Sequence, residues 1–540
     1  MPFERSKSKD LKSLLPPLKR GGRSAGDQPN LRPTGVGNEA TTAEPQNLVN
    51  LHYSYGKEPD AKVPNIDSPS PPGDEEAASA RPGTAASVIT VEAPSANSPS
   101  VAKKAKRAAK DEALLVSDRW LVRNGHSLTF IGLYLFSVMV LFRPYEIVPG
   151  LGFLSATAFY FAVATIAIYL PSQIVTESNV TMLSTEVKAV VCLTLIALIT
   201  IPIAKDVGLA WEKFNDSFIK AVVIFIVFVN VVRTRSRLMH LMWLSLGIGV
   251  YLSIAALDLY MRGQFTVENY RVGVDVGGMF GNPNEMALHF VMMMPIALTL
   301  GIAAKNKLAR IIYFAMTALF AGANMVTYSR GGFIGMLAIG AVLAWKLGRR
   351  QRITVSIASI VIGGLVLVAA PGNYALRMLS IFIPSLDPVG SSGQRQELLE
   401  RSIQVTLRNP WGLGIGCFPI VSIHNLQTHN AYTQVSTELG ILGLAAYLVF
   451  MISPFRKLGA IERKLFDAGT SNWFYYFSIG LQASLVGYMV TSFFAAVAYN
   501  WFIYYMIAYA VAFRRIYSLE CESKATEEQP SWDRQIVLAT

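Results

Sequence analysis

The chain has 540 residues, of which 52% are hydrophobic and only 16% are charged, whereas an ordinary soluble domain has a charged fraction near ~25%; the composition therefore excludes a soluble globular protein. The formal net charge is +12. This charge does not indicate a nucleic-acid-binding protein, because the Lys and Arg residues form short clusters between apolar runs, a pattern that orients membrane proteins.

Residues 1–118 are rich in Pro, Ser, Ala, Gly and charge and show no sustained apolar period. Such a segment cannot bury enough apolar surface to offset chain entropy, so we predict a disordered tail. No apolar run follows the basic N-terminus, which predicts no cleavable signal peptide and a tail that stays in the cytoplasm. A basic cluster at residues 103–110 precedes the first apolar segment. It is interpreted as a topology signal, with a contact to anionic lipids as the alternative.

Residues 119–513 contain a series of apolar segments of membrane-spanning length, which for a helix is about 20 residues. They predict an all-α polytopic membrane protein with about twelve transmembrane helices, nine within residues 119–370 and three within residues 439–513. The predicted spans are 128–142, 153–170, 189–203, 218–232, 238–257, 286–304, 311–327, 333–345, 353–370, 441–455, 474–494 and 496–513.

Charge sets the expected orientation, because cytoplasmic loops carry an excess of Lys and Arg. The loops after the fourth, sixth, eighth and tenth spans are basic, and Arg514 and Arg515 follow the twelfth; the loop after the second span, 171–186, contains no Lys or Arg. We therefore predict a cytoplasmic C-terminal tail, 514–540, in a multi-pass protein of the bacterial inner membrane. The segment 371–438 becomes a large, partly helical periplasmic loop, and connections of that length are usually functional.

The periplasmic loop contains a spaced motif. His429-Asn430 is separated by nine residues from Gly440-Ile441-Leu442-Gly443, and it is preceded by Arg395 and by the Asn-Pro and glycine turn 409–416. The pattern resembles the His-Asn, nine-residue spacer, Gly-x-x-Gly signature of bacterial O-antigen ligases. The order of these elements is similar to the periplasmic loop that those ligases share with related polysaccharide polymerases.

Two earlier segments extend the resemblance. Tyr328-Ser329-Arg330-Gly331-Gly332 forms an expected tight outer turn, and Gly281-Asn282-Pro283-Asn284-Glu285 precedes the sixth span. Both are similar to recurrent elements of the same superfamily, so the resemblance covers residues 128–513 and is strongest over 328–443. The long N-terminal tail departs from the usual compact ligase. The resemblance implies transfer of a glycan from undecaprenyl pyrophosphate to an acceptor, either lipid A core or another glycan.

Chemistry assigns roles to these residues. Since His titrates near neutral pH, His429 is the expected general base on the acceptor hydroxyl. Arg330, Arg395 and Arg271 remain charged and present planar forks that match phosphate oxygens, so we expect them to bind the pyrophosphate. The two glycines after Arg330 are interpreted as space for a phosphate to approach the backbone.

Each role has a structural alternative. His424 is also followed by Asn but lacks the glycines at the right spacing, and Arg395 shares its loop with Arg401 and Arg408. The supporting residues are Asn430, Glu438, Gly440 and Gly443. Glu438 is expected either to orient His429 or to be an ordinary interfacial carboxylate, and both glycines are expected to permit helix packing.

No metal ion or cofactor is predicted. The three cysteines form no Cys-x-x-Cys pair. The expected activity is therefore that of a metal-independent glycosyltransferase whose site opens towards the bilayer, where the polyprenyl chain of the donor stays. A polymerase of the same superfamily is the alternative, and a secondary transporter is the alternative from another class of protein, although transporters usually place ionisable groups near the bilayer midplane.

Overall fold

The computed structural model describes residues 124–528, without residues 149, 155–156, 178, 277–279, 351, 358–360, 362–371, 373, 380 and 382–390. Every regular element of these residues is helical, and one isolated β-bridge joins Val267 and Arg271. The predicted tail, 1–118, lies outside them. The elements are η1 (Val138–Phe142), α2 (Pro144–Ile147), η2 (Gly152–Leu154), α3 (Thr157–Glu177), α4 (Thr185–Thr200), α5 (Val207–Lys213), η3 (Phe214–Phe218), α6 (Ile219–Val231), α7 (Arg235–Met261), α8 (Pro283–Ala303), α9 (Lys307–Val326), α10 (Arg330–Gly348), α12 (Tyr374–Leu379), α13 (Ser391–Arg408), α14 (Phe418–Val421), η5 (Ile423–Asn425), α15 (Ala431–Asp467), α16 (Trp473–Thr491), η6 (Ser492–Phe494) and α17 (Trp501–Glu528).

Nine helical stretches of the described residues are long and apolar enough to cross a membrane. They coincide with all the predicted spans except the third, ninth and twelfth. The third is α4, which has only 16 residues, and the twelfth is α17, whose apolar run ends at Arg514 and Arg515. Most of the ninth, 353–370, lies outside the described residues. The all-helical membrane fold is therefore confirmed, and the number of twelve spans stays a prediction.

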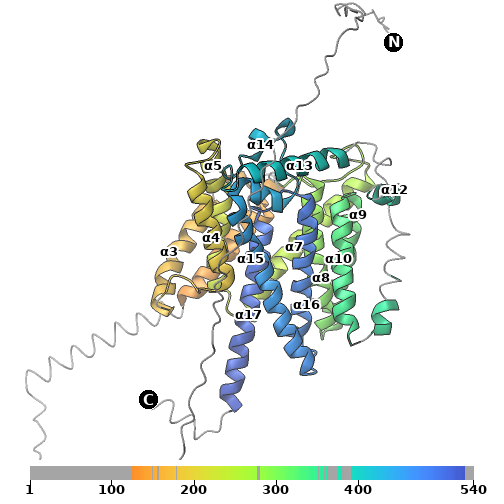
Figure 1. The fold of residues 1–540 in the computed structure, drawn as a ribbon. Helices are drawn as coiled ribbons and strands as arrows, with labels where there is room; N and C mark the ends of the chain where they lie inside the picture. The colour runs from red at the N-terminus through yellow and green to blue at the C-terminus, as the bar shows by residue number, and fades with distance from the viewer. Residues whose placement is uncertain are drawn as a thin grey trace, which may run out of the picture. The chain divides into compact units, whose positions relative to one another are not determined.

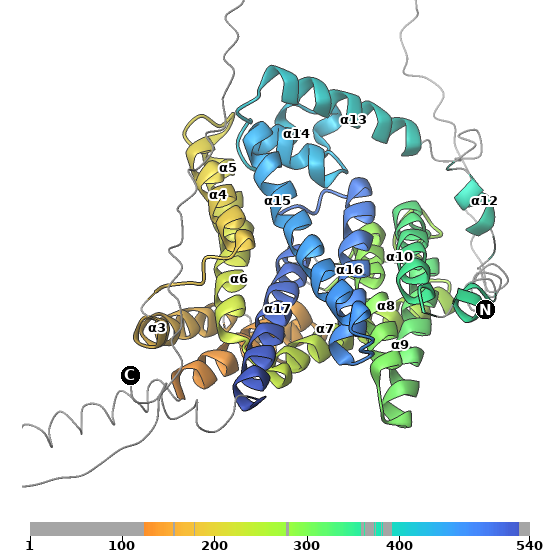
Figure 2. The same ribbon diagram turned by 60° about the horizontal axis from the view of Figure 1, so that its bottom comes forward.

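Helix α8 forms the centre of one helix group. It packs on α9, α10 and α16, and 83% of its apolar window is buried within the protein. A second group centres on α15, which packs on α4, α13 and α17. Because α16 contacts both α8 and α15, it joins the two groups, as Figure 2 shows.

Helix α13 lies across one end of the bundle, here called the α13 end (Figure 1). Three helices begin there, and each has a capping side chain. Asn282 accepts a hydrogen bond from Asn284 N at the start of α8, Ser329 accepts one from Gly332 N at the start of α10, and Asn430 caps α15. Such caps satisfy N–H groups that lack a helical partner, and they fix where each helix begins.

Three boundaries differ from the sequence prediction. Helix α15 begins at Ala431 rather than near residue 441, because the polar segment 431–438 is buried by protein and Asn430 caps it. The predicted turn at 329–332 is instead the first turn of α10, with Ser329 as its cap. In addition, α17 continues as a helix to Glu528, beyond the predicted end of its span.

The opposite end of the bundle contains three carboxylates that each pair with two basic side chains from other segments. Helix α17 runs towards this end in Figure 1. The ion pairs tie together the ends of helices that are distant in sequence. They are Glu177 with Arg233 and Arg515, Glu186 with Lys457 and Arg514, and Glu462 with Lys346 and Arg349.

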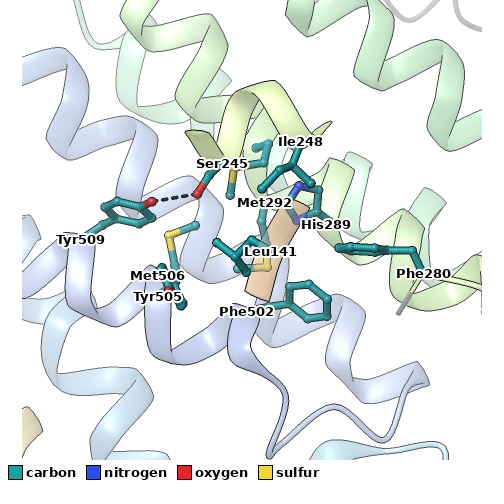
Figure 3. A pocket seen from close by; sticks show the side chains of 11 residues that line it. Leu141, Ser245, Ile248, Phe280, His289, Met292, Phe502, Tyr505, Met506 and Tyr509 are labelled. Carbon is teal, nitrogen blue, oxygen red and sulfur yellow. Dashed lines mark hydrogen bonds between the residues drawn. The ribbon is translucent and has the colours of Figure 1, made fainter. Parts of the chain in front are cut away.

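A small cavity lies in the core between α7, α8 and α17 (Figure 3). Its volume is about 20 Å³, and it is lined mainly by apolar side chains together with His289. The hydroxyls of Ser245 and Tyr509 hydrogen bond to each other beside it, at 2.7 Å. A cavity of this size has room for about one water molecule, so it is too small to be the substrate site.

Candidate active site

A larger cavity of about 350 Å³ lies at the α13 end. Four segments contribute to its wall: the turn 267–271, the start of α8, the start of α13 and the residue before the cap of α15. The lining residues are Val267, Glu268, Arg271, Asn282, Pro283, Asn284, Gln394, Arg395 and His429. Of the predicted site residues, the cavity therefore brings together His429, Arg395 and Arg271.

Arg271 is anchored on two sides. Its Nε donates to the carbonyl oxygen of Thr327 at 2.9 Å, and its Nη2 donates to Asn284 Oδ1 at 2.8 Å. Only 3% of the residue is exposed. Burial lowers the pKa of Arg271 to about 10, so the guanidinium remains charged at neutral pH and faces the cavity as a fixed cation.

His429 lies one residue before the cap of α15. Its backbone is in the left-handed region, with φ +50°, while Asn430 accepts hydrogen bonds from Tyr432 N and Thr433 N. Burial, and then the nearby charge of Arg395, lower the pKa of His429. Both effects favour the neutral imidazole, which is the form that can accept a proton.

Arg395 is positioned by the packing of α13 on α15. Leu398 and Val405 form the buried face of α13, and the hydroxyls of Thr406 and Ser436 hydrogen bond at 2.9 Å between the two helices. Since His429 directly precedes α15, this packing holds Arg395 and His429 beside the same cavity. Burial is the main cause of the lowered pKa of Arg271, and the charge of Arg395 lowers it slightly further. Such an effect is expected of cations that share one site.

Arg330 is the first residue of α10, is 8% exposed and does not line the cavity. Its neighbour Ser329 donates to Asn284 Oδ1 at 2.9 Å, so one amide oxygen joins the start of α10 to Arg271. The glycines that follow do not leave space for a phosphate. A Cβ at Gly331 would lie 2.8 Å from Phe494 Cβ, and one at Gly332 would lie 2.6 Å from Asn324 Oδ1. These glycines therefore permit close helix packing.

The supporting residues act in the framework of α15. Glu438 is 3% exposed. The carbonyl oxygens of Thr437 and Glu438 accept hydrogen bonds from Leu413 N and Gly414 N, both at 2.9 Å, so this turn of α15 braces the loop that precedes α14. Gly440 interrupts α15 with φ +74°, and a Cβ there would lie 2.3 Å from the carbonyl oxygen of Pro410. A Cβ at Gly443 would lie 2.4 Å from Leu439 Cβ, inside the same helix.

Residues 315–448 match the family model described as O-antigen ligase. The matched segment contains Arg330, Arg395, His429, Gly440 and Gly443, and this match is consistent with the O-antigen ligase and polymerase superfamily. A search among curated proteins finds no match to the sequence.

Two segments that line the cavity, the turn 267–271 and the start of α8, lie before the matched residues 315–448. Asn282 and Asn284 flank a proline at the first helical position, a typical helix start, so the sequence offered a signal for them. Glu268 and Arg377 also belong to this region of the fold. Neither stands in a recognisable motif, and sequence reasoning missed both.

No group of three or more His, Cys, Asp or Glu side chains in the described part of the chain is arranged to hold a metal ion. The charged groups around the cavity are mainly guanidinium groups. Metal-independent catalysis remains a prediction.

Proposed function

We propose that the protein transfers a glycan from undecaprenyl pyrophosphate to an acceptor hydroxyl at the periplasmic face of the bacterial inner membrane, in the manner of an O-antigen ligase. One observation carries the proposal: the imidazole of His429, the buried guanidinium of Arg271 and the half-buried Arg395 share a cavity of about 350 Å³ at the end of a membrane helix bundle. The match to the O-antigen ligase family supports the class of reaction.

The charge distribution supports the orientation. The three carboxylates at the end opposite α13 are each paired with two basic side chains, and lysines and arginines concentrate on the cytoplasmic side of membrane proteins. The α13 end then faces the periplasm. Its arginines at the cavity are exceptions to the charge rule, which is expected of residues that bind an anionic substrate.

The reaction needs a proton acceptor and a stabilised leaving group. His429 accepts the proton of the acceptor hydroxyl while the hydroxyl oxygen attacks the anomeric carbon of the donor sugar. The bond between that carbon and the phosphate oxygen breaks, and the electron pair leaves with undecaprenyl pyrophosphate. Arg271 and Arg395 stabilise the negative charge that develops on the leaving diphosphate. Arg330 follows Ser329, whose hydroxyl donates to Asn284, and its positive charge adds to that of the two arginines at the cavity.

Replacement of His429 tests this function. In His429→Ala, mature surface polysaccharide should disappear and the lipid-linked donor should accumulate. His424→Ala is the matched control, because His424 lies exposed in the same loop and does not line the cavity; it should retain normal polymer. Normal polymer in His429→Ala would refute the role of the base, and uptake of labelled glycan into vesicles that is insensitive to this substitution would favour a transporter.

A second assay separates ligase from polymerase. Purified protein is incubated with a lipid-linked repeat unit, first without and then with lipid A core acceptor. A ligase should give product only when the core acceptor is present. Chain lengthening without the core acceptor would instead assign the protein to the polymerases.

A further inference from the structure

We propose that Glu268 is a resident counter-ion of the arginine site, whose carboxylate holds the place of a diphosphate oxygen until the donor displaces it. The inference rests on the proposed function, because it names a specificity-determining residue for the same site. It makes donor binding an exchange of one anion for another.

The carboxylate of Glu268 lies between two guanidinium groups. Its Oε1 is 3.7 Å from Arg271 Nη1, and its Oε2 is 3.4 Å from Arg377 Nη2. The arginine side chains are only 4% and 9% exposed, whereas that of Glu268 is 24% exposed and lines the cavity. An anion that enters the cavity therefore meets Glu268 at the same cations that would bind the anion.

Both arginines have anchors that do not depend on Glu268. Arg271 is held by Thr327 O and Asn284 Oδ1. The Nε of Arg377 donates to the carbonyl oxygen of Tyr328 at 3.2 Å, and its guanidinium lies 4.9 Å from the ring centroid of Tyr270. The two cations therefore keep their positions when the carboxylate moves away, as an exchange of anions requires.

The turn that contains Glu268 has an unfavourable backbone conformation for this residue type. Glu268 and Asn269 are the first two of the three residues between the bridged Val267 and Arg271, and both have positive φ, +53° and +58°. Turns of this kind favour glycine or asparagine at such positions. A glutamate there accepts a strained backbone and places a carboxylate against the arginines, where the hydroxyl of Tyr270 also donates to it at 2.5 Å.

The exchange has a kinetic consequence. A competing carboxylate weakens the binding of the donor, but it also helps to expel the undecaprenyl pyrophosphate product, which carries a free diphosphate. Glu268→Gln preserves the size of the side chain and removes its charge. This variant should lower KM and also lower kcat by slowing product release, whereas loss of a purely structural support for Arg271 would raise KM.

The direct test measures binding of inorganic pyrophosphate to purified protein in nanodiscs by calorimetry. Glu268→Gln should bind pyrophosphate about tenfold more tightly than wild type, which corresponds to about 1.4 kcal/mol. Glu400→Gln is the matched control, because Glu400 is an exposed carboxylate on α13 that does not line the cavity; its affinity should equal that of wild type. Arg271→Gln combined with Glu268→Gln should lose the gain.

The outcomes separate the inference from the function that it extends. Binding by wild type with equal or weaker affinity in Glu268→Gln overturns the counter-ion role and leaves the proposed function intact. Absence of pyrophosphate binding in both proteins overturns the diphosphate site and the inference with it. If Glu268→Gln does not fold, Glu268→Asp carries the test, because it withdraws the carboxylate by one methylene; affinity no greater than that of wild type would then overturn the proposal.

Discussion

Replacing Arg271 with Lys should reduce kcat/KM by roughly 10- to 150-fold although the positive charge is kept. The guanidinium donates to Thr327 O and Asn284 Oδ1 at 2.9 and 2.8 Å while it faces the cavity. A single ammonium nitrogen cannot reach both acceptors and the substrate. At least one hydrogen bond of a charged donor is lost, which costs about 1.5–3 kcal/mol, and each 1.4 kcal/mol is about tenfold in rate or affinity.

The assay is transfer of glycan from a lipid-linked donor by purified protein in nanodiscs, with initial rates measured over a range of donor concentrations. Arg262→Lys is the matched control, because Arg262 ends α7 with a side chain that is 65% exposed and pairs with Asp258. Exposed pairs contribute little, so its kcat/KM should stay within about twofold of wild type. Activity of Arg271→Lys within about threefold of wild type, or an equal loss in Arg262→Lys, would refute the reasoning.

Two further predictions concern the base and the framework. Burial and then Arg395 lower the pKa of His429 below 6.5, and a base acts above its pKa; Arg395→Gln should therefore move the acid limb of the kcat/KM profile to higher pH, and an unmoved limb would contradict their coupling. Gly440→Ala should destabilise the protein by about 1–3 kcal/mol, because a Cβ would lie 2.3 Å from Pro410 O. Thermal denaturation measures this loss, and Gly322→Ala, with open space around its Cβ position, should show none.

The membrane helices could be predicted because their signal is local. A run of about 20 apolar residues stabilises a helix in lipid whatever surrounds it. The start of α15 lacks that signal, since residues 431–438 are polar and are buried by other protein segments. The cap at Asn430 marks the true beginning, but a hydropathy criterion does not detect a cap.

The site could be predicted only in part, because only some of its residues belong to a motif that is local in sequence. The spacing from His429 to Gly440 is local in sequence, and it leads to one wall of the cavity together with Arg395. The depth of Arg330 depends on how Asn284, Ser329 and Phe494 pack, and no short motif encodes this packing. Glu268 contacts Arg377, which is 109 residues away in sequence. Its place between Arg271 and Arg377 therefore follows from the fold and not from a local motif.

The cavity lies between the two helix groups, and this position explains why its cations are held apart. Arg271 and Asn284 belong to the group around α8, Arg395 and His429 belong to the group around α15, and α16 joins the groups. Burial, and then the charge of Arg395, lower the pKa of His429, and Arg395 also adds to the effect of burial on the pKa of Arg271. The repulsion by Arg395 is relieved when an anion enters the cavity. A diphosphate bound there would therefore strengthen the contact between the groups, and its departure with the product would restore the repulsion that Glu268 partly offsets.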